Sequence, residues 1–73
     1  DPPGLFEPRR GFGKLWREEP GVRDRLGWAL ERERAGSVSY QRFERGDLLL
    51  VWRESVVWEL TPGGLAHHAP RSS

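Results

Sequence analysis

The sequence predicts an α+β domain in which a short helical hairpin packs on a three- to four-stranded antiparallel β-meander. Two observations support this prediction. Apolar residues recur at helical spacings of three and four in the first third of the chain. From residue 37 onward they alternate with polar residues or form short runs between turn signals, as strands of an antiparallel sheet do.

Two short helices are expected, the first over residues 11–19 and the second over residues 20–27. Pro20 ends the first helix or begins the second, and Gly27 stands where a helix C-terminus is commonly capped. We expect two to three turns in each arm of this hairpin. Its apolar residues would share one side: Phe12, Leu15, Trp16, Val22 and Leu26.

The strands are expected to follow one another with tight turns between them. In order, the segments are a strand over 37–43, a turn at Arg45-Gly46-Asp47, a strand over 48–52, a turn at 53–55, a strand over 56–60, a turn at 61–64 and an edge strand over 65–67. In such a meander Trp52 and Trp58 would be cross-strand neighbours across the second turn.

The chain holds one domain at most, because 73 residues supply a single core of only a few kcal/mol. Residues 1–10 contain three prolines and one glycine, which predicts a lead-in arm without regular structure. Residues 11–66 would form the domain and residues 67–73 a flexible tail. Since Asp1 takes the place of an initiating methionine, we expect a processed product or a piece of a longer protein.

Composition excludes several classes of protein. There is no cysteine, so neither a disulfide framework nor a thiolate metal site is available. Twelve lysines and arginines against eleven acidic residues give a net charge of +1, which is too balanced to suggest a nucleic-acid-binding surface, so binding of nucleic acid stays a third hypothesis that only the number of arginines favours. No apolar run approaches the ~20 residues of a membrane span.

Signatures of catalysis and of cofactor or metal binding are missing. The segment at 11–14, GFGK, lacks the third glycine and the preceding strand of a phosphate-binding loop. His67 and His68 are adjacent, so on a strand they would face opposite sides and could not share a metal. Nearly every acidic residue has an arginine beside it, which solvated ion pairing explains. We therefore expect neither an enzyme nor a cofactor.

The tryptophans carry more information than any other residue type. There are four in 73 residues, and they fall in four different predicted elements. All four could serve the core of a small domain that has no disulfide. Alternatively, one or two could remain on the surface, either to stack on sugar rings or to anchor another protein.

An ordered set of residues resembles the LGFP repeat of bacterial cell-surface and cell-wall-associated proteins. The set begins with Leu26-Gly27-Trp28 and Glu33, continues through Tyr40 to Gly46 with Phe43 between them, and ends with Leu49 and Trp52. Trp28 takes the place of the phenylalanine and Ala29 that of the proline in the family's Leu-Gly-Phe-Pro. The resemblance covers about half of the chain, and it implies a noncatalytic module that attaches proteins to the cell envelope.

The sequence thus predicts an extracellular or cell-surface module that binds envelope polysaccharide through aromatic faces and arginines. The rival prediction is a structural or interaction module whose aromatic residues bury against another protein chain, including copies of itself. The candidate ligand-binding residues are Trp28, Tyr40, Arg42, Trp52, Arg53 and Trp58.

Overall fold

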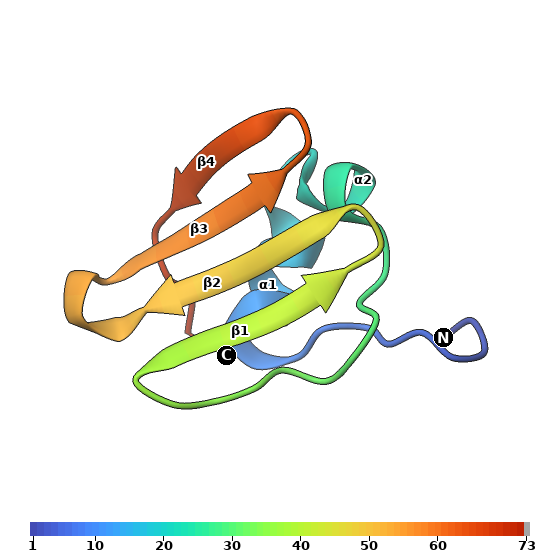
Figure 1. The fold of residues 1–73 in the computed structure, drawn as a ribbon, viewed down its shortest axis with the longest axis horizontal. Coiled ribbons are helices and arrows are strands. Elements are labelled where there is room, and N and C mark those ends of the chain that lie inside the picture. The colour runs from blue at the N-terminus through green and yellow to red at the C-terminus, as the bar shows by residue number, and fades with distance from the viewer. Residues whose placement is uncertain (73) are drawn as a thin grey trace.

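A computed structural model describes residues 1–72 and has two helices on one side of a four-stranded antiparallel sheet (Figure 1). The elements are α1 (Arg10–Glu18), α2 (Val22–Leu26), β1 (Val38–Phe43), β2 (Gly46–Val51), the 3-10 turn η1 (Trp52–Glu54), β3 (Val56–Thr61) and β4 (Gly64–His68). The strands lie in chain order, each antiparallel to the next. The predicted α+β meander is therefore confirmed, with a fourth strand.

The helical hairpin presents the predicted apolar side to the sheet. Its five predicted residues are all buried, together with Ala29, Phe43, Leu48, Leu50 and Val57 from the rest of the chain. Gly27 caps α2 with a positive φ of 76°, and its N–H bonds the carbonyl of Arg23. At five residues, α2 is shorter than the expected two to three turns, because Gly21 and Gly27 bound it closely.

The sheet has one covered face and one open face. On β1, buried Ser39, Gln41 and Phe43 alternate with the more exposed Val38, Tyr40 and Arg42. Figure 1 looks onto the open face, with α1 and α2 behind the strands. We call these the inner face, which packs on the helices, and the outer face, which no element of residues 1–72 covers.

Three sequence-based details about the turns are wrong. Trp52 lies in η1 instead of a strand, and Trp58 pairs with Leu49 and His67, so the two tryptophans are not cross-strand neighbours. Gly46 belongs to β2 and not to a turn, which consists of residues 44 and 45. It is glycine for lack of space, since a Cβ there would collide with the backbone carbonyl of Leu60 on β3.

Both ends of the described chain contact the domain. In the arm, Phe6 exchanges two backbone hydrogen bonds with Ala29, at 2.9 and 3.0 Å. Near the other end, Arg71 makes ion pairs with Glu18 and Glu19 at the end of α1. Because β4 continues through His68, the predicted tail includes two residues that belong to the sheet.

Candidate binding surface

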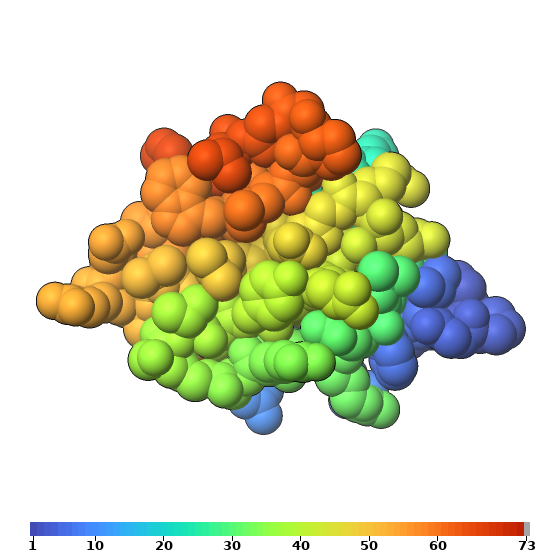
Figure 2. All heavy atoms as spheres, viewed as in Figure 1, coloured from blue at the N-terminus to red at the C-terminus, as the bar shows by residue number. Residues whose placement is uncertain are grey.

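The outer face of the sheet is mainly apolar. Its outward-facing positions follow from the strand alternation and are Val38, Tyr40, Arg42, Asp47, Leu49, Val51, Val56, Trp58, Leu60, Leu65 and His67. The space-filling view shows side chains of all four strands merging into one broad surface (Figure 2). A monomeric protein seldom leaves a continuous apolar surface of this kind without a use for it.

A row of four residues crosses the middle of the outer face. The strand register places Tyr40 opposite Leu49, Leu49 opposite Trp58, and Trp58 opposite His67. The rings of Trp58 and His67 meet edge to face with their centroids 5.7 Å apart. Since neighbouring strands are ~4.8 Å apart, the Tyr40 and Trp58 backbones are separated by roughly 10 Å. We call these four residues the aromatic row.

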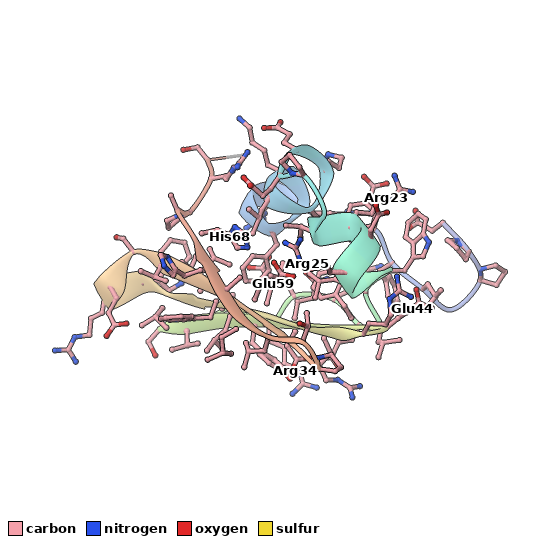
Figure 3. All side chains as sticks on the ribbon, turned by 90° about the horizontal axis from the view of Figure 1, so that it is seen from above. Arg23, Arg25, Arg34, Glu44, Glu59 and His68 are labelled. Atoms are coloured by element: carbon pink, nitrogen blue, oxygen red, sulfur yellow. The ribbon has the colours of Figure 1, made fainter. Side chains whose placement is uncertain are left out.

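Polar groups border the aromatic row at β1. The Nε of Arg42 and a guanidinium nitrogen of Arg34 both lie 3.5 Å from the same Glu31 carboxylate oxygen. In Figure 3, Arg34 lies on the side of the sheet away from the helices. Burial raises the pKa of the Tyr40 phenol, and the nearby charge of Asp47 raises it further, so the hydroxyl stays protonated. This end of the row therefore offers hydrogen-bond donors.

Aliphatic side chains flank the aromatic row on both sides. Val38, Val51 and Val56 form one cross-strand row, and Leu60 pairs with Leu65 beyond the other side. Val38 is 41% exposed and Leu65 68% exposed, which is high for such apolar side chains. The outer face is thus an aromatic strip with a valine row on one side. On the other side lies a row that is charged at Arg42 and Asp47 and aliphatic at Leu60 and Leu65.

Three of the six predicted ligand-binding residues share this surface, namely Tyr40, Arg42 and Trp58. Trp28 does not, because it packs against the core on the helix side. Its ring lies 5.3 Å from that of Trp16, and the guanidinium of Arg23 lies over both rings at 4.8 and 5.4 Å. Trp28 is therefore half-buried because it packs on the core. This agrees with the prediction that the tryptophans serve the core and not with a place in a binding surface.

Trp52 and Arg53 lie in η1, at the end of the sheet. Arg53 lines a shallow groove with Val38 and Val51, so it borders the outer face. Trp52 also lines this groove, but its indole N–H turns to the inner face and bonds the Ser39 hydroxyl at 3.1 Å. The six predicted residues thus do not form one site.

Leu49 and His67 belong to the aromatic row but are not among the predicted residues. Leu49 falls within the run Leu48 to Val51, in which every residue is apolar, so its direction depends on the strand register. His67 carries a usable signal, because adjacent residues on a strand face opposite sides. In the structure His67 does contact Trp58 on the outer face, whereas His68 turns inward.

An ion-paired carboxylate lies beneath the sheet, opposite the aromatic row. Glu59 accepts hydrogen bonds from Arg25 at 2.6 and 2.9 Å and contacts the His68 Nε2 at 2.9 Å. Figure 3 shows the three side chains between the sheet and the helices. The Arg25 hydrogen bond lowers the pKa of Glu59 despite the opposing effect of burial, and His68 lowers it further. Both oxygens are engaged and the side chain is only 2% exposed, so this cluster connects α2, β3 and β4 without presenting the carboxylate to solvent.

Comparison with models of protein families, with curated proteins and with solved structures finds no match for this chain. Within residues 1–72, no helix is long and apolar enough to cross a membrane. The same residues bring together no group of three or more metal-ligating side chains. The aromatic row and its borders are therefore the main indication of function.

Proposed function

We propose that this domain is a noncatalytic module of an extracellular or cell-surface protein, and that it binds envelope polysaccharide through the outer face of its sheet. The observation that carries the proposal is the aromatic row, in which Tyr40 and Trp58 lie in line on a face that no described element covers. The resemblance to the LGFP repeat supports the same class of function and the same location.

The chemistry of the outer face suits a chain of sugar rings. The C–H face of a sugar ring is apolar and packs on aromatic and aliphatic side chains, while its hydroxyls require hydrogen-bond partners. Tyr40 and Trp58 would contact successive parts of one glycan chain. Arg42, Arg34 and the Tyr40 hydroxyl would then donate hydrogen bonds to sugar oxygens at one border.

Co-sedimentation with purified, insoluble cell-wall polysaccharide tests the proposal. Trp58→Ala and Tyr40→Ala should each weaken binding about tenfold, which corresponds to ~1.4 kcal/mol for each lost ring contact. Trp28→Phe is the matched control, since it changes an aromatic residue on the helix side. Circular dichroism should show that all three variants are folded.

Two results would contradict this proposal. One is absence of wild-type binding to wall polysaccharide at high protein concentration. The other is binding that both outer-face variants retain at wild-type strength, because the aromatic row would then have no part in it.

A second candidate function is association with another protein. The valine row favours it, because Val38, Val51 and Val56 form an apolar row across three neighbouring strands, of the kind that packs on a second sheet ~10 Å away. Val51→Lys should then abolish concentration-dependent assembly measured by light scattering, while Trp28→Phe leaves assembly unchanged. If the wild-type chain stays monomeric at all concentrations, self-association is excluded.

A further inference from the structure

A pocket lies on the helix side of the sheet, away from the aromatic row. It has a volume of about 590 Å³, and its principal lining residues are Arg10, Phe12, Glu33, Leu50, Trp52 and Val57. Phe12, Leu50 and Val57 are buried core residues and make its apolar floor. We call it the Trp52 pocket. Its volume lies in the range of ~300–1,000 Å³ that is typical of small-molecule sites.

Trp52 forms a fixed, exposed wall of this pocket. The side chain is held by the hydrogen bond from its Nε1 to Ser39, which is itself almost fully buried. Nevertheless, 56% of Trp52 is exposed. Among the large apolar residues of 1–72, only Leu65 is more exposed. A ring that is oriented but uncovered contributes little to the core, and it can stack on a ligand without a large loss of conformational entropy.

Three charged residues line the Trp52 pocket, namely Arg10, Glu33 and Arg71, and Arg71 is already ion-paired with Glu18 and Glu19. Burial raises the pKa of Glu33, against the opposing effects of the Arg10 charge and the nearby Ser39 hydroxyl. Arg10 is exposed and forms no ion pair within 4.0 Å among residues 1–72. It also has a φ of 54°, a left-handed conformation that costs a non-glycine residue energy and tends to occur at ligand sites.

A neighbouring cavity extends this polar rim. It has a volume of about 300 Å³ and shares Arg10, Glu33 and Ala35 with the Trp52 pocket. Gln41 also lines it, and the Oε1 of this buried side chain has no hydrogen-bond donor within residues 1–72. The Nε2 of Gln41 bonds the carbonyl of Glu31, which fixes the orientation of the amide. The two cavities therefore offer two acceptors, Glu33 and Gln41, near Arg10, and the smaller cavity is also lined by the charged residues Asp1, Glu7, Arg9 and Arg32.

We propose that the Trp52 pocket binds a single neutral sugar ring, a hexopyranose, as a second site distinct from the outer face. The apolar side of the ring stacks on Trp52, its hydroxyls donate to the Glu33 carboxylate, and Arg10 donates to a sugar oxygen. A simple anion fits less well because Glu33 would repel it and because Arg71, the second arginine of the pocket, is already paired with Glu18 and Glu19. A purely apolar ligand would bury Arg10 and Glu33 without hydrogen-bond partners, which is costly.

The proposal does not depend on the outer face, because the aromatic row and the Trp52 pocket lie on opposite faces of the sheet. Leu50 and Val57 of the pocket point inward, and they alternate with the outward-facing Leu49 and Trp58. Soluble monosaccharides probe the pocket, whereas wall polysaccharide probes the outer face. Failure of one proposal can therefore be distinguished from failure of the other.

The test is a titration of the uniformly ¹⁵N-labelled chain with glucose and with N-acetylglucosamine, followed by NMR. We expect a saturable shift of the Trp52 indole N–H signal with a millimolar dissociation constant. Trp52→Leu and Glu33→Gln should weaken binding at least tenfold, measured on the backbone amide signals of residues 33–36 and 39. Trp58→Leu is the matched control and should leave the affinity unchanged.

The outcomes are decisive in either direction. Saturable shifts around the pocket that Glu33→Gln abolishes in a folded chain support the proposal. Absence of a saturable shift with both sugars overturns it, and so does an affinity that Trp58→Leu reduces while Glu33→Gln does not. Glucuronate serves as the charged probe, and tighter binding of glucuronate than of glucose would overturn the assignment to a neutral ring.

Discussion

The Arg25–Glu59 pair should respond very differently to loss of one partner than to loss of the other. The side chain of Glu59 is 2% exposed and that of Arg25 is 46% exposed. In Arg25→Met the buried carboxylate keeps only His68, so the cost should approach the ~3 kcal/mol lower bound for breaking a buried pair. In Glu59→Gln the remaining Arg25 can turn to water. We therefore expect the free energy of unfolding to fall by only about 1–2 kcal/mol, at the low end of what a hydrogen bond to a charged group contributes.

Equilibrium unfolding in urea at neutral pH measures these differences. The set consists of the wild type, both single variants and the double variant. The double variant should be more stable than Arg25→Met alone, because it no longer buries an unpaired charge. The cycle gives the coupling free energy between the two side chains, which must then exceed the cost of Glu59→Gln alone and which we expect to be about 2–3 kcal/mol.

The pH dependence of the free energy of unfolding is an independent test, because its direction should differ between the wild type and Arg25→Met. The pKa of Glu59 is lowered by folding, so the unfolded chain binds its proton more readily than the folded chain. The stabilisation from Glu59 is therefore complete above the unfolded pKa of ~4.3 and is lost as the pH falls through the folded value. In Arg25→Met only His68 still opposes the rise of the Glu59 pKa that burial causes, so that variant should gain stability on mild acidification. Equal costs for the two single variants, or a wild-type pH slope in Arg25→Met, would refute this reasoning.

Three further outcomes are expected. Gly46→Ala should cost about 1–3 kcal/mol in urea unfolding, because the new methyl group meets a β3 carbonyl that has no room to move. Trp28→Ala should cost about 2 kcal/mol through lost packing on Trp16, yet leave polysaccharide binding unchanged; a loss of binding in the folded variant would place Trp28 in the site. Ser39→Ala should cost at most about 1 kcal/mol while the Trp52 indole signal broadens or shifts, and an unchanged signal would mean that the hydrogen bond does not hold the ring.

Much of the fold could be predicted from periodicity. The apolar side of the hairpin, the cap at Gly27 and the chain-order sheet all follow from spacing and turn residues, because these depend on local geometry. The role of Gly46 could not be predicted in this way. It depends on the backbone of Leu60, which comes close only when β2 and β3 pair.

It was harder to predict to which face of the sheet each strand side chain points. The candidate site depends on this, because it lies on the outer face. In β3 the tryptophan Trp58 points outward and the glutamate Glu59 points inward, the reverse of what polarity alone predicts. Glu59 is stable there because Arg25 reaches it from 34 residues away in the sequence. A partner so distant leaves no signal in the local pattern, so the outer face becomes evident only once the register is known.

The contacts of Phe6 and Arg71 have a mechanical consequence. Phe6 is fastened to Ala29 by a pair of backbone hydrogen bonds, and Arg71 is fastened to the end of α1 by ion pairs. A pull applied to both ends of the described chain would first act on these two attachments. They would yield before the antiparallel ladders of the sheet separate, so the outer face should keep its shape under modest tension.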